Sequence, residues 1–465
     1  MIKINFPKFI KKNKKKLKNI MVLFVLAPAL VIPTFAEGAK KVPNTNDTKV
    51  EETQQTQQTL KLPTFSPWAT ADLNEAQFMG IFPNERFYDG TDYKKEAKLE
   101  ELKKLNELSN KKLTERDIKT GGVFEFKNLT RIEVLNSISR LLNKEEFSIK
   151  DLQDKKIFRG ESDEKYLNSK IPLQEALALY ARTVNGVLQE NGKTSKGFFY
   201  EVKNKDNTIY MLGSIHVGKN EMYPIDGKII DSLKKSQKIY MEVDLTNPNA
   251  AKIMQEAMYY KDNTTLKDDL GDELYAKVVK IFGNLGLKEE SIRKMRPWAV
   301  VNSLSIDPSG ETGNAAFGVE SYFISQALLN GIKVGELESI EFQRDLLSGF
   351  DKETYITMIK DSVEEIENNG YKNINAQLDA MLESWIKGDK KIIAGSFRQK
   401  SDDASVKFNN ALVETRDANM AEKIEKLLKQ DGKNTYFVLV GSAHLVPDES
   451  ITGILKDKGY EVVEK

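Results

Sequence analysis

The sequence predicts an α/β domain with a mixed β-sheet and a helical insertion, preceded by a mainly α-helical domain. Two observations support this prediction. Stretches with helical periodicity fill residues 63–196, whereas residues 197–465 alternate short β-branched and aromatic runs with longer helical stretches. Strands that alternate with helices are typical of an α/β domain, and this one opens with a predicted hairpin.

The first 36 residues have the pattern of a secretory signal peptide. Eight lysines and no acidic residue precede the apolar stretch Ile20–Ile32, and Thr34-Phe35-Ala36 offers a small-x-small cleavage site. An uncleaved membrane anchor is the competing interpretation, although Ile20–Ile32 is shorter than the ~20 residues that span a bilayer. Residues 37–62, rich in Thr, Gln, Asn and Lys, are a predicted disordered linker. We therefore expect a secreted or extracytoplasmic protein, associated with the cell wall or the membrane.

The composition argues against several classes of function. Removing the eight lysines of the signal peptide leaves 62 of the 70 basic residues against 69 acidic ones, a formal charge of −7. That charge disfavours a nucleic-acid partner. The absence of cysteine rules out disulfides, thiolate zinc sites and a cysteine nucleophile, so an exported protein of this kind must rely on its hydrophobic core.

Four stretches of the N-terminal domain have helical periodicity: Phe65–Pro83, Tyr93–Asp117, Leu129–Asn143 and Ile171–Leu188. Gly80 and Pro83 are expected to close the first of these helices. Thr130 is the expected N-cap of the third, with Glu133 as its capping-box partner. Pro172 stands at the start of the last helix, where proline is well tolerated.

The residues around these helix ends resemble S-layer homology modules. The resemblance rests on Trp68-Ala69, Gly80-Ile81-Phe82-Pro83, Thr130-Arg131-x-Glu133 and the Pro172 helix as a further unit. It covers roughly Phe65 to Gln189, where a long charged insert and irregular repeats depart from the pattern. The resemblance implies non-covalent docking to a cell-wall polymer. A plain helical domain that packs on the α/β domain is the alternative.

The predicted strands of the C-terminal domain are Phe198–Lys203, Thr208–Leu212, Lys238–Leu245, Ile332–Leu337, Thr435–Val440 and Gly459–Val463. The first two flank a turn at Asn204–Asn207 and form the predicted hairpin. Most of Pro248–Leu304 and Phe350–Leu428 has helical periodicity. These long stretches are the predicted helical insertion.

Both histidines of the chain follow a predicted strand in the same context, G-S-x-H. His216 comes after Thr208–Leu212, and His444 comes after Thr435–Val440. In α/β sheets, ligands bind beyond the carboxyl ends of the strands, and imidazole is a common metal ligand and proton shuttle. A single histidine is more often a structural residue. Two histidines in matching positions favour a shared site for a metal or for acid–base chemistry.

The motifs along residues 197–465 resemble the TraB/GumN family, which is related to the Tiki metalloproteases. The matching features are Gly213-Ser214-Ile215-His216, Met241-Glu242-Val243-Asp244, Arg296-Pro297-Trp298, Gly318-Val319-Glu320, Glu336-Leu337-Glu338, Trp385 with Gly388-Asp389, Arg416, and Gly441-Ser442-Ala443-His444. Their order and spacing span the whole domain. One departure is Asp417, because an asparagine is commoner after this arginine. The resemblance assigns Asp417 no role.

The resemblance implies an α/β domain in which two GxxH histidines and a strand glutamate bind a divalent metal, with peptidase activity in the Tiki branch. The implied metal ligands are His216, Glu242 and His444, and the implied catalytic residues are these three with Arg416. Asp244 and Glu320 are implied to support the cofactor or to bind substrate. Acidic residues at strand ends can equally be solvated or salt-bridged, which is the alternative for Asp244, Glu320 and Glu338. For Arg416 the alternative is an ion pair on a helix surface.

Two imidazoles and a carboxylate are a common ligand set for a catalytic metal that keeps one position open for water. Such a metal lowers the pKa of its bound water toward ~7 and polarises a carbonyl. We therefore hypothesise an exported, cell-envelope-associated hydrolase that uses manganese, cobalt or zinc and acts on a peptide or protein. The alternative is a non-enzymatic surface protein that captures a peptide signal, a metal or haem on the same fold. A third interpretation is a structural surface protein in which the helical modules carry the function.

Overall fold

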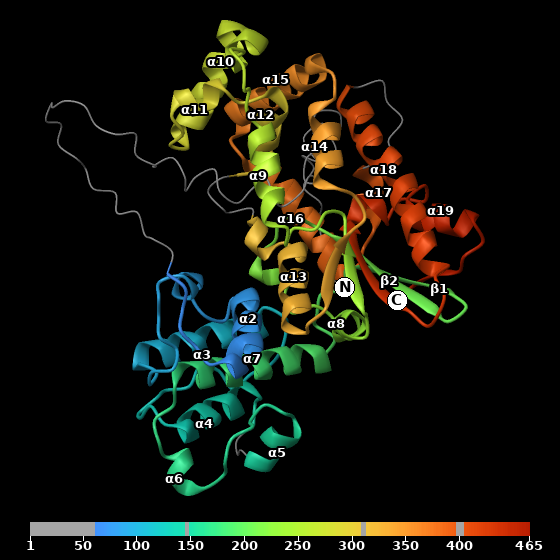
Figure 1. Cartoon of the computed structure of the whole chain (residues 1–465). Coiled ribbons are helices and arrows are strands. Elements are labelled where there is room, and N and C mark those ends of the chain that lie inside the picture. The colour runs from blue at the N-terminus through green and yellow to red at the C-terminus, as the bar shows by residue number, and fades with distance from the viewer. Residues whose placement is uncertain (1–60, 145–147, 308–312, 397–403) are drawn as a thin grey trace, which may run out of the picture. The chain divides into compact units, whose positions relative to one another are not determined.

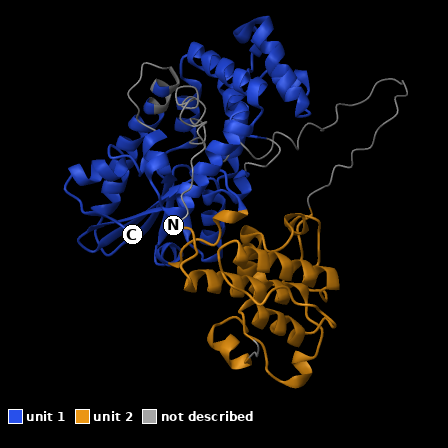
Figure 2. Cartoon of the chain, turned by 180° about the vertical axis from the view of Figure 1, so that it is seen from behind, with its two compact units in different colours: residues 1–36, 196–219, 228–465 blue, residues 37–195, 220–227 orange. Residues whose placement is uncertain are grey.

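The computed structural model describes residues 61–144, 148–307, 313–396 and 404–465 (Figure 1). The predicted signal peptide and most of the predicted linker lie outside these residues. The described chain divides into two compact units, which Figure 2 colours separately. The helical unit comprises residues 61–195 together with Asn220–Gly227, and the α/β unit comprises Lys196–Lys219 and Lys228–Lys465. None of the helices in the described ranges combines the length and apolar character that a membrane span requires.

The described part of the α/β unit contains one six-stranded sheet. Its strands are β1 (Phe198–Asn204), β2 (Asn207–Ser214), β3 (Lys238–Met241), β4 (Lys333–Glu336), β5 (Thr435–Gly441) and β6 (Val462–Glu464). They lie in the order β4-β3-β5-β2-β1-β6. The pairs from β4 to β2 are parallel, whereas β1 pairs antiparallel with β2 and β6. The predicted mixed sheet is confirmed.

The predicted hairpin is confirmed in β1 and β2. Asn204 pairs with Asn207, so only Lys205 and Asp206 connect the two strands. Lys205 has a positive φ of 52°. Short hairpin turns favour positive φ because that backbone twist matches the twist of the flanking strands.

The parallel strands of this sheet end at one common edge. Ser214, at the end of β2, lies opposite Gly441 of β5. Met241, at the end of β3, lies opposite Leu439 of β5 on one side and Glu336 of β4 on the other. The carboxyl ends of β2, β3, β4 and β5 therefore lie side by side, at the edge where α/β sheets bind their ligands.

Helices cover this sheet and form a hydrophobic core beside it. They are α8 (Gly227–Lys234), α9 (Pro248–Ala257), α10 (Leu266–Asn284), α11 (Glu289–Arg293), α12 (Pro297–Leu304), η7 (Ala315–Phe317), α13 (Val319–Leu329), α14 (Ile340–Ser348), α15 (Lys352–Asn369), α16 (Lys372–Lys387), α17 (Lys391–Ser396), α18 (Ala404–Leu428), η8 (Ser442–His444) and α19 (Ile451–Asp457). α13 packs on the sheet through Phe323, whose ring lies 5.2 Å from that of Phe437 on β5. α9, α10, α12, α14 and α15 share a core that includes the fully buried Met254, Val278 and Ile359. Of these helices, α9, α10, α12 and α15 lie in the stretches predicted as the helical insertion, whereas α14 lies between those stretches. Figure 1 shows α10 and α11 at the end of this helical group that is farthest from the strands.

The helical unit contains η4 (Pro67–Ala69), α2 (Thr70–Met79), η5 (Asn84–Phe87), α3 (Leu99–Thr114), α4 (Arg131–Leu141), α5 (Ile149–Asp154), α6 (Glu164–Leu167), α7 (Leu173–Glu190) and η6 (Asn220–Met222). Gly80 ends α2 in the left-handed conformation, as predicted. Thr130 is the N-cap of α4, but the predicted capping box is wrong. Glu133 instead accepts hydrogen bonds from the N–H groups of Lys127 and Asn128, because the chain before Thr130 folds back toward it.

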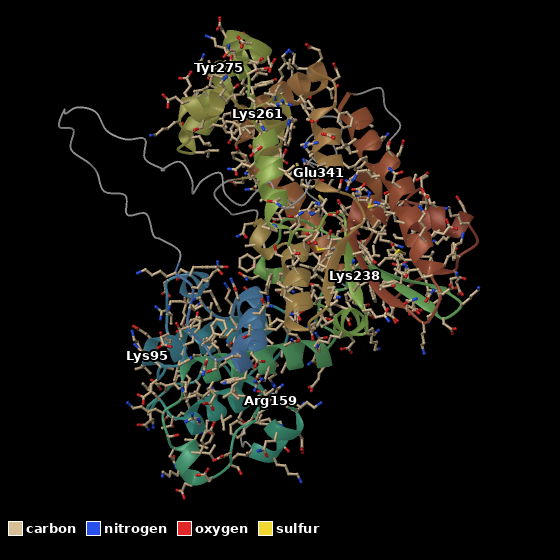
Figure 3. The ribbon with its side chains drawn as sticks, in the orientation of Figure 1. Lys95, Arg159, Lys238, Lys261, Tyr275 and Glu341 are labelled. Atoms are coloured by element: carbon tan, nitrogen blue, oxygen red, sulfur yellow. The ribbon has the colours of Figure 1, made fainter. Side chains whose placement is uncertain are left out.

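Most charged side chains lie on the outside of each unit. Lys95 and Arg159 are exposed in the helical unit, and Lys261 and Glu341 are exposed in the α/β unit (Figure 3). Tyr275, on α10, is by contrast buried at 6% exposure. This division of polar and apolar side chains fits the 30% charged composition.

Candidate functional site

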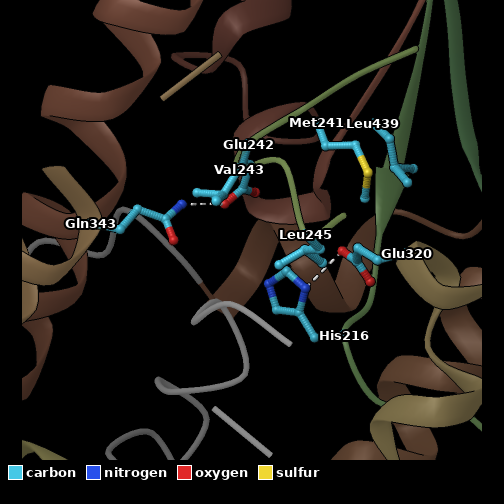
Figure 4. A pocket seen from close by; sticks show the side chains of 8 residues that line it. All are labelled: His216, Met241, Glu242, Val243, Leu245, Glu320, Gln343 and Leu439. Atoms are coloured by element: carbon cyan, nitrogen blue, oxygen red, sulfur yellow. Dashed lines mark hydrogen bonds and ion pairs between the residues drawn. The ribbon is translucent and has the colours of Figure 1, made fainter. Parts of the chain in front are cut away.

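A small pocket lies at the edge where the parallel strands end. Its lining residues are His216, Met241, Glu242, Val243, Leu245, Glu320, Gln343 and Leu439 (Figure 4). Its volume is about 10 Å³, close to the room that one water molecule needs. Four of these side chains are polar, and they come from a strand end, two helices and a loop. The pocket can therefore hold something of the size of an ion or a water molecule.

His216 reaches the pocket from the loop after β2. The N–H of Val319 donates to the carbonyl of Ile215 at 3.1 Å, which ties the start of α13 to this loop. As a result, His216 Nδ1 lies 2.7 Å from Glu320 Oε1. The two residues are only 6% and 5% exposed. A carboxylate at Nδ1 favours the proton on that nitrogen and orients the ring, so Nε2 points away from Glu320.

His444 has the same kind of partner on the other side of the site. It lies in η8, directly after β5, and its Nδ1 lies 2.6 Å from Oδ1 of Asp417 on α18. Both residues are 0% exposed. The opposite ring nitrogen, Nε2, lies 3.7 Å from Glu242 Oε1. The carboxylate of Asp417 thus turns Nε2 of His444 toward the carboxylate of Glu242.

The two GxxH motifs are in direct contact. Ser442 Oγ, in the second motif, donates to the carbonyl of Ser214 in the first at 2.8 Å. Parallel pairing of β2 with β5 produces this contact, since Ser214 lies opposite Gly441. The two histidine loops therefore leave adjacent strands at the same level.

Glu242, one residue beyond β3, lies between these loops and is hydrogen-bonded through both oxygens. Its Oε1 accepts from the N–H of Gly441 at 2.6 Å. Its Oε2 accepts from Arg416 Nη2 at 2.5 Å and from Gln343 Nε2 at 3.3 Å. A carboxylate oxygen has two lone pairs, so Oε1 has a second one that can accept a hydrogen bond from His444 or bind an ion.

Arg416 binds two buried carboxylates. Besides Glu242, it contacts Glu338 through Nε at 2.8 Å and through Nη2 at 2.6 Å. Gln343 Nε2 lies 3.3 Å from Glu338 Oε2 and so bridges the same two carboxylates. Arg416 is 1% exposed and Glu338 is 4% exposed. The interpretation of Arg416 as a surface residue is therefore wrong, because α18 turns it into the core.

These charges set the ionisation of the site. Burial alone would raise the pKa of Glu242, but Arg416, with smaller contributions from His444 and His216, lowers that pKa to about 2. Burial disfavours the charge of Arg416, but Glu242 and Glu338 outweigh it and raise the pKa of the guanidinium. Glu242 and Arg416 are both charged at neutral pH.

The depressed pKa of Glu242 predicts a pH dependence of stability. The ionised side chain stabilises the fold above its usual pKa of 4.5, and this contribution is lost as the pH falls toward about 2. Between pH 4.5 and about 2, we expect the free energy of unfolding to fall less in the Glu242→Gln variant than in the wild type. Urea unfolding at a series of pH values measures this. Glu341→Gln, at an exposed position of α14, is the control, and its free energy of unfolding should change with pH as that of the wild type does. Equal slopes for Glu242→Gln and wild type would contradict the expectation.

The structure brings most of the predicted site residues together. His216, Glu242 and Glu320 line the pocket, and His444 and Arg416 contact Glu242 from outside its lining. Asp244 does not line the pocket. Its Oδ1 accepts from the N–H of Thr246 at 2.9 Å and from the Thr246 hydroxyl at 2.6 Å, so it shapes the turn after β3.

Sequence reasoning missed two residues at this site. Asp417 had no assigned role, and Gln343 was not considered. A signal for Gln343 exists in the chain, because Ser339 caps α14 and places Gln343 one turn into the helix, facing back toward Glu338. No comparable signal marks Asp417, which depends on how α18 faces η8.

The α/β unit also matches a known family. Residues 198–464, more than half of the chain, fit the model of the TraB/PrgY/gumN family. The chain belongs to the TraB/PrgY/gumN family. The resemblance predicted from the two GxxH motifs and the residues between them is thereby confirmed for this family.

Relatives with metalloprotease names match this TraB-family chain at low identity. It is 20% identical over 321 residues to "Metalloprotease TIKI homolog" of Nematostella vectensis, covering 58% of this chain and 67% of the relative. It is 21% identical over 310 residues to "Metalloprotease TIKI1" of Danio rerio, covering 57% of this chain and 62% of the relative. An uncharacterized protein of Treponema pallidum is 21% identical over 276 residues, with coverage of 56% and 80%. The chain thus spans about two thirds of the length of these two Tiki relatives, and no solved structure matches it.

The donor chemistry of this TraB-family site fits a divalent metal. Within the described residues, no three His, Asp or Glu side chains are arranged to hold an ion. The pair formed by His444 Nε2 and Glu242 Oε1, however, is 3.7 Å apart. With the proton of His444 on Nδ1, both atoms carry lone pairs that a divalent cation could accept. Metal–nitrogen and metal–oxygen bonds of ~2.0–2.2 Å are compatible with that separation.

Gly318, in the Gly-Val-Glu motif, lies where a side chain would displace the His216 loop. A Cβ at this position would lie 2.2 Å from the carbonyl oxygen of His216. Its φ of −64° suits any residue, so close approach rather than backbone conformation requires glycine. We expect Gly318→Ala to lower the free energy of unfolding by about 1–3 kcal/mol, the usual effect of overpacking.

Chemical denaturation measures this effect. Gly283→Ala is the matched control, because a Cβ at this helical position of α10 meets nothing within 4 Å. Alanine is the better helix former by ~1 kcal/mol, so this control should be neutral or stabilising. Wild-type stability in Gly318→Ala would show that the loop tolerates a Cβ.

Proposed function

We propose that this TraB-family protein is a metal-dependent hydrolase, specifically a peptidase, in which His216, Glu242 and His444 hold a divalent cation. The observation that supports this best is the arrangement around Glu242. Its carboxylate is held in the ionised form, and each of the two histidines has a carboxylate on Nδ1. Such carboxylate–histidine pairs orient imidazoles toward metals in known sites. Manganese, cobalt and zinc all accept this ligand set.

The residues of the chain have distinct roles in this proposal. Glu320 and Asp417 orient the two imidazoles, and Arg416 keeps Glu242 anionic and in place. A bound divalent ion would polarise a substrate carbonyl and lower the pKa of its bound water toward ~7. Glu242 serves as a ligand rather than as a proton acceptor, because its pKa of about 2 leaves it a weak base.

Glu320 is the better candidate for the proton acceptor. It lines the pocket, and its Oε2 is buried without a hydrogen bond among the described residues. An oxygen in that position is able to take a proton from a water molecule in the pocket while Oε1 stays with His216. General-base catalysis of this kind contributes typically 10²–10⁴-fold to a rate.

The peptide substrate and the location are further parts of the proposal. The names of the Tiki relatives support a peptide or protein substrate. The pattern of the first 36 residues supports export, and the S-layer-like helix ends support association with a cell-wall polymer through the helical unit. Both proposals on location rest on the sequence.

The test is metal-dependent peptide cleavage by the chain from Glu37 onward. The chelator-treated protein is incubated with a defined pool of synthetic peptides, with and without Mn²⁺, Co²⁺ or Zn²⁺, and products are identified by mass spectrometry. Cleavage should require added metal and should disappear in Glu242→Gln. Asp244→Asn is the matched control, since Asp244 follows the same strand but binds Thr246 outside the pocket. Peptide binding without cleavage, in the presence of metal, would favour the non-enzymatic binding protein.

A further inference from the structure

Trp385 contacts the first GxxH motif within the α/β unit. It lies in the last turn of α16 and is 0% exposed. Its indole N–H donates to the carbonyl of Gly213, the first residue of the motif that ends in His216, at 2.7 Å. A buried indole N–H usually has a partner of this kind, because tryptophan has no other polar side-chain atom. The ring therefore ties the end of α16 to the backbone that carries His216.

Three consecutive carbonyls of this motif are held from three different elements. They belong to Gly213, Ser214 and Ile215, and their donors are, in this order, Trp385 Nε1 at 2.7 Å, Ser442 Oγ at 2.8 Å and the N–H of Val319 at 3.1 Å. α16, the second GxxH motif and the start of α13 thus each supply one donor. The three residues that carry these carbonyls are buried, and buried carbonyls without a partner are unfavourable, so these bonds fix the path from β2 to His216.

The indole is seated against the start of β1. The N–H groups of Lys196 and Gly197 donate to the carbonyls of Ile386 and Trp385, both at 3.0 Å. Gly197 has a φ of 56°, and a Cβ on it would lie 3.1 Å from Trp385 Cζ2. Glycine suits this position because of the left-handed backbone and the close approach of the ring. The donor to Gly213 is thus held in place by the strand that pairs with β2.

Gly213 is also closely packed against the second GxxH motif. A Cβ on Gly213 would lie 3.0 Å from both Cα and Oγ of Ser442. Ser442 begins η8, which contains His444. A displacement of the Gly213 backbone would therefore disturb the contact between the two motifs as well as the loop of His216. The hydrogen bond from Trp385 thus affects both histidines, although Trp385 does not line the pocket.

We propose that Trp385 is a positioning residue for the histidine site, because its indole N–H fixes the Gly213 carbonyl at the point where the His216 loop leaves β2. The indole acts through the backbone rather than at the pocket. The N–H is the decisive group, rather than the apolar surface of the ring. The consequence for metal binding rests on the proposed function, whereas the consequence for loop order does not.

Hydrogen–deuterium exchange of the metal-free chain from Glu37 onward tests the effect on the loop. In Trp385→Phe, which removes the N–H and some volume, amides of residues 214–218 should exchange about tenfold faster because local opening becomes easier, whereas α10 should keep its protection. Trp298→Phe is the matched control, since Trp298 is 3% exposed and its Nε1 has no hydrogen-bond partner among the described residues. This control should leave the exchange of residues 214–218 unchanged.

A second variant separates the N–H from the volume of the ring. Benzothienylalanine in place of Trp385 keeps the bicyclic shape and has sulfur at the position of the N–H, so its ring has no donor. It should accelerate the exchange of residues 214–218 as Trp385→Phe does. If Trp385→Phe fails to fold, this variant decides the proposal.

Cobalt binding tests the consequence for the site. The benzothienylalanine variant should bind Co²⁺ about tenfold more weakly and with altered visible absorption bands, the lower end of the effect expected when a group that orients a ligand is lost. Trp298→Phe should keep the wild-type affinity and spectrum.

The two measurements together decide the proposal. Wild-type exchange over residues 214–218 in the benzothienylalanine variant overturns it, whatever happens to cobalt. Faster exchange with wild-type cobalt affinity and spectrum also overturns it, because the bond then supports only the fold. Absence of cobalt binding in the wild type would sink the proposed function, while the exchange result still decides whether the N–H orders the loop.

Discussion

Replacing Arg416 by methionine is expected to lower the free energy of unfolding by about 3–5 kcal/mol, the usual result of removing one partner of a buried ion pair. Arg416 is the cation shared by Glu242 and Glu338, and all three side chains are at most 9% exposed. Methionine fills a similar volume but leaves two carboxylates in the core, and among the described side chains only Gln343 Nε2 remains as a donor to both. Their repulsion and desolvation together would raise the pKa of one of them.

Urea unfolding at neutral pH measures this change. Arg344→Met is the matched control, because Arg344 pairs with Asp345 at 2.7 Å with side-chain exposures of 35% and 67%. Exposed pairs contribute only about 0–1 kcal/mol, so the control should resemble the wild type. Adding Glu338→Gln to Arg416→Met should recover part of the loss, since one buried carboxylate is then neutral. Similar stabilities for the Arg416 and Arg344 variants would mean that water or local rearrangement compensates the carboxylates.

The sheet could be predicted from the sequence because its strands have strong local signals. β2 and β5 are apolar runs that end in glycine and a polar residue, and their parallel pairing places Ser214 opposite Gly441. Once both strands lie in one sheet, the two GxxH motifs must meet at one edge. β3 is shorter than predicted, ending at Met241, because Asp244 turns the chain by binding Thr246. From the sequence alone, an aspartate that forms a turn directly after a strand cannot be distinguished from one that contributes to a site.

The site residues on α18 could not be predicted in the same way. Arg416 and Asp417 are adjacent on α18, yet both are buried, and each meets a different partner across the site. Helical periodicity does not mark such a pair, since consecutive residues point in directions about 100° apart. Their roles depend on the tertiary placement of α18 against β3 and η8. The same holds for Glu133, whose predicted capping bond is lost to the backbone of Lys127 and Asn128.

The strongest effect on metal binding is expected when both histidines are replaced. Alanine is a poor choice at His444, because Asp417 is 0% exposed and would keep a buried charge without its imidazole partner. Asparagine retains an N–H donor at the place of Nδ1, where it can reach Asp417, and the same reasoning applies at His216 and Glu320. In His216→Asn/His444→Asn the fold should therefore persist while two of the three proposed ligands are gone.

Metal content after equilibration with Zn²⁺, Mn²⁺ or Co²⁺ should fall from about one per chain to near zero, since a single carboxylate ligand is insufficient for a site of this type. Stabilisation by metal, about 2.7 kcal/mol at a hundredfold excess over Kd, should vanish with it. Asp244→Asn should behave as wild type in both measurements, because its side chain is engaged by Thr246 away from the pocket. Stoichiometric metal in the double variant would place any bound ion elsewhere in the chain. Glu320 and Asp417 would then be partners of structural histidines rather than supports of metal ligands.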